Sequence, residues 1–149
     1  MSPRLRCFFV VLFALAGCME GQKLDPLSRS TLYENLGGEK GISRVVDDFV
    51  ATVVADDRIR AEHRKHFEKG DVPGLKRKLI EQIGEATGGP QKYTGRTMRE
   101  AHKGLGITNE DFDALVDDLS RVLIRNKVSE SDRKALMNLL SPMRKDIVE

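Results

Sequence analysis

Apolar residues recur at intervals of three and four along most of this chain, which is the spacing of helices that bury one face. The longest stripe, over 39–55, is rich in β-branched residues that also suit a strand, but its length and the acidic pair Asp47-Asp48 favour a helix. No segment alternates apolar and polar residues as a half-buried strand does. The pattern therefore predicts an all-α fold, with helices over 31–36, 39–55 and 75–87 and further helices that begin at Thr108 and Ser129.

A shorter predicted helix carries a histidine in its last turn. His102 shares an apolar face with Met98 and Leu105, at spacings of four and three residues. Glycines follow at 104 and 106, and glycine adopts the left-handed conformation that ends many helices. An imidazole in this setting can bind a metal through one nitrogen while the other orients the ring. It is also the setting of an ordinary core histidine, and from this segment alone we favour that interpretation.

The stretch 56–74 is the weakest part of the pattern, because charged residues crowd it and no regular apolar stripe is present. We expect a short helix followed by a loop, since glycine and proline punctuate its end. It contains His63, His66 and Phe67. In these charged surroundings we expect both histidine side chains to face solvent.

Several separated motifs resemble those of one protein family. They are Thr31-Leu-Tyr-Glu-Asn-Leu-Gly-Gly38, Gly88-Gly-Pro-Gln-Lys-Tyr-Thr-Gly95, the segment around His102 and the closing Pro142-Met-Arg-Lys-Asp-Ile147. In this order and at these spacings they resemble the group 1 truncated haemoglobins, in which two helices pack over two around a haem. The resemblance covers a domain over 31–149 and implies that His102 is the proximal ligand of the haem iron.

The resemblance implies haem b, held non-covalently. The only cysteines, Cys7 and Cys18, precede the domain, so the two-cysteine pattern that attaches haem covalently is absent. Phe67 resembles the phenylalanine that packs on the haem face, Tyr93 a tyrosine near the haem edge, and Met98 a side chain on the proximal face. Each has a plainer alternative, as a core residue or as one that closes a loop.

On the opposite, distal side the chain departs from the family. Many members carry a tyrosine where Val50 stands, which donates a hydrogen bond to the bound ligand, and a glutamine where Leu79 stands. The position of the usual distal gatekeeper is here Leu75, so all three positions that normally hold donors are apolar. An apolar pocket cannot stabilise the partial negative charge of bound oxygen. The sequence therefore predicts weak retention of oxygen.

Lys78 is the polar exception on the distal helix. In some family members a histidine or lysine at this position binds the iron as a sixth ligand, so Lys78 is a candidate for that role. It belongs to the run Lys76-Arg77-Lys78, and such runs more often face solvent or pair with a carboxylate such as a haem propionate. We favour that second interpretation. His63 and His66 are further candidate distal ligands only if their segment folds inward.

The resemblance implies a protein that binds diatomic ligands such as oxygen or nitric oxide at its haem. It extends to redox chemistry on nitric oxide with a reductase as electron donor, and leaves open whether the protein is an enzyme. The first alternative is an electron-transfer or sensor protein with a sixth protein ligand, and the second is a helical interaction module without haem. The formal charge of +2 includes Arg4 and Arg6, which we expect to be removed, so nothing favours a nucleic-acid partner.

Residues 1–18 resemble the signal peptide of a bacterial lipoprotein. Two arginines make a positive start, and an apolar run over 8–16, too short to span a membrane, leads into Leu15-Ala-Gly-Cys18. Lipid on Cys18 would make the protein an exported, membrane-anchored lipoprotein, at the periplasmic face or in the outer membrane. A plain signal peptide and an uncleaved anchor are the alternatives. We expect 19–30 to be a flexible tether.

Overall fold

The computed structural model describes residues 30–149, and every segment of regular secondary structure in that range is helical. The elements are α1 (Leu32–Asn35), α2 (Gly38–Ala55), α3 (Ala61–Glu68), α4 (Val72–Ala86), α5 (Met98–His102), α6 (Asn109–Arg125), α7 (Glu130–Leu140), the 3-10 turn η1 (Ser141–Met143) and α8 (Arg144–Ile147). The expected signal peptide, Cys18 and the tether up to residue 29 lie outside the described residues. Within the described range, no helix has the length and apolar character needed to cross a membrane.

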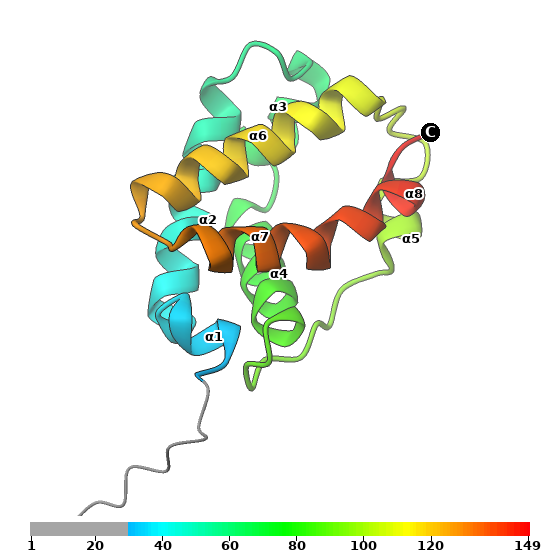
Figure 1. Cartoon of the computed structure of the whole chain (residues 1–149). Coiled ribbons are helices and arrows are strands. Elements are labelled where there is room, and N and C mark those ends of the chain that lie inside the picture. The colour runs from blue at the N-terminus through cyan, green and yellow to red at the C-terminus, as the bar shows by residue number, and fades with distance from the viewer. Residues whose placement is uncertain (1–29) are drawn as a thin grey trace, which may run out of the picture.

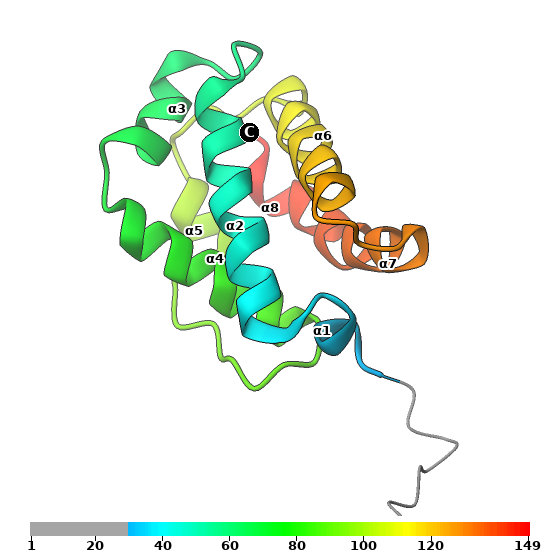
Figure 2. The ribbon, with the colours of Figure 1, turned by 90° about the vertical axis from the view of Figure 1, so that its left-hand side faces the viewer.

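Helix α2 is the centre of the fold, because it packs against both α4 and α6. Helices α3, α4 and α5 lie on one side of α2, and α6 and α7 lie on the other (Figure 1, Figure 2). The pair α2 and α4 and the pair α6 and α7 form the predicted arrangement of two helices over two.

Helix starts coincide with side chains that cap them. Thr31, Thr97 and Thr108 each accept a hydrogen bond from the backbone amide three residues on, and the acidic residue there bonds back to the threonine amide. Ser129 caps α7 through the amide of Asp132. These bonds satisfy amides that a helix leaves free at its start. Helices α1, α6 and α7 therefore begin within a residue or so of the predicted positions.

The stretch predicted as a short helix and a loop contains more helix than we expected. Helix α4 begins at Val72, ahead of the predicted start at residue 75. The Asp71 carboxylate accepts a hydrogen bond from the Gly74 amide at 2.9 Å, and Pro73 lies in the first turn, where its missing amide proton costs nothing. The proline that suggested a loop in fact belongs to the start of the helix.

Pro142 interrupts the final helix, as predicted. The 3-10 turn η1 separates α7 from α8, because proline removes a helical hydrogen bond and crowds the preceding turn. Helix α8, which follows this turn, packs against the short helix α5.

Completely buried side chains concentrate where α2 meets α6 and α7, at Val53, Val122, Leu123 and Leu136. Close packing there fixes the helices relative to one another. Side chains nearer α5, such as Met98, are only partly buried. The helices that form the packed core thus also border the more open region beside α5.

Candidate cofactor site

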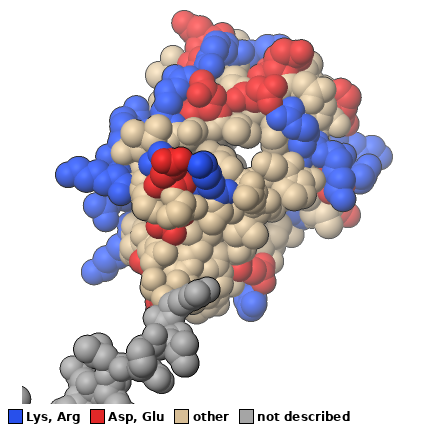
Figure 3. Space-filling model, viewed as in Figure 1, with Lys and Arg blue, Asp and Glu red and all other residues tan. Residues whose placement is uncertain are grey.

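A cavity of about 780 Å³ lies between α4 and α5 and extends to α2, α6 and α7. Its walls are mostly apolar, with Leu75, Leu79 and Ile83 from α4 and with Phe112 and Leu115 from α6. The space-filling view shows a hollow near the centre of the face that α6 and α7 form (Figure 3). A mostly apolar cavity of this size suits a flat organic cofactor.

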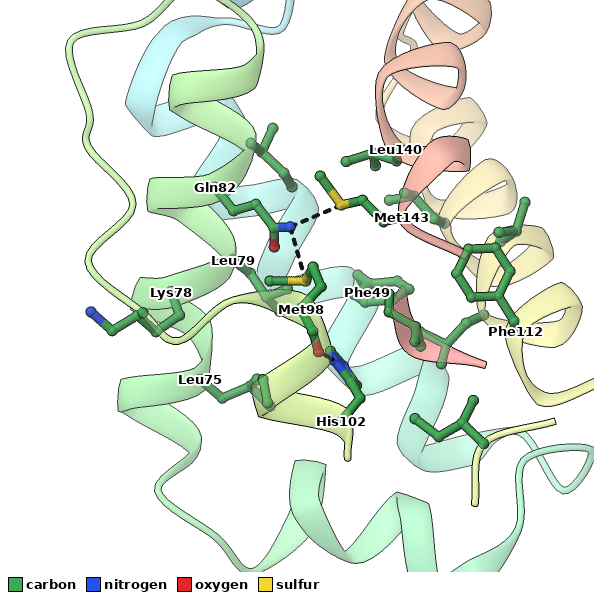
Figure 4. Close-up of a pocket in the computed structure, with 18 of the residues that line it drawn as sticks. Phe49, Leu75, Lys78, Leu79, Gln82, Met98, His102, Phe112, Leu140 and Met143 are labelled. Atoms are coloured by element: carbon green, nitrogen blue, oxygen red, sulfur yellow. Dashed lines mark hydrogen bonds between the residues drawn. The ribbon is translucent and has the colours of Figure 1, made fainter. Parts of the chain in front are cut away.

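His102 lies in the last turn of α5 and lines this cavity (Figure 4). Its Nδ1 is 2.7 Å from the carbonyl oxygen of Met98, one turn earlier in the helix. Because a carbonyl oxygen only accepts, Nδ1 carries the proton and donates it. Nε2 then holds the lone pair, and no described residue forms a hydrogen bond with it. The geometry leaves one oriented nitrogen for a metal ion.

The short helix α5 depends on other parts of the chain, because a helix of about one turn is not stable alone. Thr97 caps its start, and Arg99 forms an ion pair with Asp146 of α8 at 2.6 Å. The position of His102 is therefore determined by contacts between elements and not by helix propensity.

The wall opposite α5 is mostly apolar, but one of the three residues predicted to line it does not reach it. Leu75 and Leu79 line the cavity, whereas Val50 is buried in the core. Consecutive side chains on a helix point about 100° apart, and on α2 it is Val45, Val46 and Phe49 that line the cavity. The ring of Phe49 meets that of Phe67 edge to face, with 6.5 Å between centroids. Phe67 lines the cavity too.

The cavity also holds an amide that we did not predict from the sequence. Gln82 Nε2 donates to the sulfur atoms of Met98, at 3.4 Å, and of Met143, at 3.1 Å (Figure 4). The available signal was its spacing of three residues from Leu79 and seven from Leu75, which puts Gln82 on the same helical face. The cavity is therefore not free of donors, contrary to the prediction. Thioether sulfur is a weak acceptor, so this amide can exchange it for a stronger one.

Lys78 lines the cavity, but its ammonium group points away from His102 (Figure 4). Its Nζ is 3.1 Å from Glu81 Oε2 and also donates to the hydroxyl of Thr94. Glu81 accepts two more hydrogen bonds from Thr94, from the amide at 3.1 Å and the hydroxyl at 2.8 Å. The bonds from Thr94, and then the one from Lys78, lower the pKa of Glu81, so it is an anionic partner. Lys78 is thus paired with a carboxylate of the protein.

Tyr93 both lines the cavity and closes the loop before α5. Its hydroxyl donates to the carbonyl oxygen of Arg96 at 2.8 Å, and its amide donates to Glu85 of α4 at 3.0 Å. Burial raises the pKa of the phenol. The hydrogen bonds of Tyr93 show that it closes the loop, and packing of its ring against a haem edge stays a prediction.

The two histidines of α3 differ from each other. Both line the cavity, but His66 is exposed whereas His63 is buried, with only 8% of its surface exposed, contrary to the expectation that both face solvent. His63 Nε2 is 3.0 Å from the carbonyl oxygen of Leu105, and Nδ1 is 3.6 Å from Asp111 of α6. These partners, distant in sequence, allow the imidazole to be buried.

An all-helical fold of two layers, an apolar cavity and one oriented imidazole on its wall together define a globin. A family model for the bacterial-like globins matches residues 31–149, and the chain belongs to this family.

Truncated haemoglobins are among the proteins most similar to this chain. A group 1 truncated hemoglobin of Tetrahymena pyriformis is 33% identical over 119 residues, which cover 79% of this chain and 94% of the relative. One of Synechocystis is 43% identical over 107 residues, which cover 68% of this chain and 82% of the relative. The crystal structure of the Tetrahymena pyriformis protein in its Fe(III) form matches with a TM-score of 0.72 at 30% identity, over 80% of this chain and 98% of that one. The predicted truncated-globin fold is confirmed.

Proposed function

We propose that this protein holds a haem through the Nε2 atom of His102 and binds small diatomic molecules on the opposite face of the haem. The observation that carries the proposal is the 2.7 Å hydrogen bond from His102 Nδ1 to Met98. It fixes both the ring and its tautomer, as the second nitrogen of a metal-bound histidine usually does. When bound, the haem supplies an iron that takes up and releases oxygen or nitric oxide.

The residues that line the cavity fit a haem. The walls are apolar along α4 and α6, as the faces of a porphyrin require, and the volume of about 780 Å³ lies in the range of sites for small organic cofactors. Lys78, Arg96 and the exposed His66 border the same cavity and suit the carboxylates of the haem. We expect the haem to be non-covalent, because both cysteines of the chain precede residue 31. Extraction with acidified organic solvent should therefore remove it.

Replacement of His102 tests the ligand. Wild-type protein purified with added haemin should show an intense Soret band that shifts when the ferrous form meets carbon monoxide. His102→Ala should lose most of this band on gel filtration, whereas Lys134→Ala, which changes an exposed side chain of α7 outside the cavity, should keep it. A His102→Ala spectrum equal to the wild-type one would contradict ligation. A wild-type protein without a Soret band would favour the haem-free interaction module.

A second candidate function is electron transfer or sensing by a haem with Lys78 as sixth ligand. Its support is the place of Lys78 among the residues that line the cavity. The ion pair with Glu81 opposes it, because an amine binds iron only after it loses its proton and leaves its partner. We therefore favour the open site.

Redox chemistry on nitric oxide, with a separate reductase as electron donor, is a further proposal that the family resemblance implies. The scarcity of hydrogen-bond donors on the apolar wall weakens the version that needs bound oxygen. Consumption of nitric oxide by the reduced protein in the presence of oxygen tests it. A rate no higher than that of His102→Ala would exclude this activity.

We also propose that the chain is exported and anchored in a membrane by lipid on Cys18. The support is the order of a positive start, an apolar run and Leu15-Ala-Gly-Cys18. Each buried methylene of an attached lipid contributes about 0.8 kcal/mol, so two or more chains anchor firmly. Membrane fractionation of wild type against Cys18→Ser decides the matter, and equal association of the two with membranes refutes the anchor.

A further inference from the structure

The loop that follows His102 has little regular structure of its own. Lys103–Ile107 joins α5 to α6, and a bond from the Leu105 amide to the His102 carbonyl oxygen, at 3.1 Å, closes one turn. Gly104 and Gly106 have φ values of 78° and 60°, in the left-handed region that favours glycine. A loop of this kind moves freely unless other elements hold it, and its movement would be passed to the last turn of α5.

Glu149 holds the loop from one side. Its carboxylate accepts hydrogen bonds from the amides of Gly104 and Gly106, each at 2.7 Å, with one oxygen for each amide. Its own amide donates to the carbonyl oxygen of Ile107 at 3.0 Å. The end of the chain that follows α8 lies beside this loop (Figure 1). The bonds from Gly104 and Gly106 lower the pKa of Glu149, so the carboxylate is charged and its bonds are charge-assisted.

Two residues near the start of α3 hold the same loop from the other side. His63 Nε2 is 3.0 Å from the Leu105 carbonyl oxygen, and Arg60 donates to the carbonyl oxygen of Gly106. Arg60 forms an ion pair with Asp111 at 2.8 Å, and His63 Nδ1 lies 3.6 Å from the same carboxylate. Asp111 is 3% exposed and belongs to α6, so the anchor is part of the packed fold.

We propose that Glu149 and His63 are positioning residues for His102. They clamp Lys103–Ile107 from two sides, and the clamp holds the last turn of α5, and with it the His102 ring, at a fixed place on the cavity wall. The clamp itself does not depend on a cofactor, but its purpose rests on the proposed role of His102 as the iron ligand. Such outer contacts affect how tightly a metal is bound, because they orient the residue that coordinates it.

Amide exchange measures the clamp without reference to ligand chemistry. In the carbon monoxide-bound ferrous protein, which is diamagnetic and suits NMR, Glu149→Ala should speed exchange at the Gly104 and Gly106 amides by about tenfold or more. Glu149→Gln keeps one acceptor oxygen in place of two, so it should protect one of the two amides. Glu130→Ala is the matched control, since Glu130 is an exposed acid of α7 that pairs with Lys134. Unchanged exchange in Glu149→Ala would overturn the clamp.

The iron–histidine stretching band of the ferrous, ligand-free protein reports whether the clamp positions His102. Glu149→Ala and His63→Ala should shift or broaden this resonance Raman band and release haem to excess apomyoglobin about tenfold faster, as loss of outer contacts does at other metal sites. The amide of His63→Gln can still donate to the Leu105 carbonyl. This variant should therefore have a band and a rate of haem release close to those of wild type. The two alanine variants could show fast amide exchange and yet keep the band and the haem release rate of wild type. That result would refute a role of the clamp in positioning His102. Absence of the band from wild type would instead refute ligation by His102 and the positioning role with it, while exchange would still report the clamp.

Discussion

The two walls of the cavity are built in opposite ways. On the α5 side, the His102 ring donates a hydrogen bond to its own helix, and the loop behind it is bonded to Glu149. On the α4 side, Leu75 and Leu79 present no polar atom, and the amide of Gln82 rests on two sulfur atoms. Hydrogen bonds to the backbone and to a charged group hold the side chains of the α5 wall in one arrangement. Apolar contacts and weak acceptors allow several arrangements of the side chains of the α4 wall.

This contrast separates retention of the cofactor from control of its ligand. The α5 wall supplies one fixed nitrogen, so changes there should alter haem binding by large factors. The α4 wall supplies space and a single adjustable amide, so changes there should alter ligand rates by small factors. Substitutions on the two walls therefore test the contrast.

The largest effect is expected from His102→Gly. Removal of the imidazole should weaken haem affinity at least about 100-fold, on the order of 3 kcal/mol, because no other described side chain has an oriented free nitrogen on this wall. Free imidazole should enter the vacated space and restore part of the Soret absorbance. Haemin titration with and without imidazole measures both. If His102→Gly binds haem as tightly as wild type, the α5 wall does not supply the nitrogen that retains the haem.

Asp111→Asn tests the support of the α5 wall through stability. Burial raises the pKa of Asp111, but hydrogen bonds from Thr108 and Arg60 outweigh it and hold the pKa at about 2, below the usual 3.8. A carboxyl whose folded-state pKa is lowered stabilises the fold above the unfolded value, and this contribution is lost as pH falls toward the folded value. The variant should lose about 2 kcal/mol of unfolding free energy near neutral pH and show a flatter acid limb between about pH 4 and 2.

Denaturant titrations at a series of pH values measure this prediction. Asp113→Asn is the control, because Asp113 is exposed and pairs with Arg144. If the free energy of unfolding falls as steeply with decreasing pH in Asp111→Asn as in wild type, Asp111 does not support the loop.

The α5 wall was predictable because its chemistry lies in one short segment. Thr97 caps the helix, His102 ends it and its ring bonds to Met98, so a local motif carries the ring, whereas contacts with α8 and with the loop after α5 set where the helix lies. The other features depend on residues that meet only in the fold. Gln82 is placed by sulfur atoms from two other elements, and burial of His63 depends on Asp111 of α6. Charge and spacing within one segment do not reveal such partners.

The boundary of α4 shows a second limit of sequence patterns. Pro73 is compatible both with a loop and with the first turn of a helix, and the local sequence alone did not decide between them. The structure decides through Asp71, whose side chain caps the helix at the Gly74 amide. Leu75 and Leu79 nevertheless face the cavity as the stripe predicted.

A moderate effect is expected from Gln82→Leu. If the amide leaves the sulfur atoms to donate to a bound ligand, its loss should speed oxygen release about 3- to 10-fold, the value of one neutral hydrogen bond. Leu79→Gln, which adds an amide one turn away, should slow release. Flash photolysis or rapid mixing measures the rates. If wild type and Gln82→Leu release oxygen at the same rate, the Gln82 amide does not bond to the bound oxygen.

The smallest effect is expected from Lys78→Ala. Because Lys78 pairs with Glu81 and Thr94, the variant should keep the wild-type ferric spectrum and bind carbon monoxide within about twofold of the wild-type rate. Lys92→Ala, which removes an exposed lysine paired with Glu85, is the matched control. Loss of a low-spin ferric signal in Lys78→Ala alone would identify Lys78 as a sixth ligand.

Rapid mixing of the ferrous protein with carbon monoxide tests most directly whether one fixed nitrogen faces an open wall. Before mixing, the spectrum should be that of a five-coordinate haem with a histidine ligand. The observed rate should rise linearly with carbon monoxide concentration in a single phase, because no protein group has to leave first. A six-coordinate low-spin starting spectrum, with a rate that levels off as carbon monoxide increases, would contradict the open α4 wall.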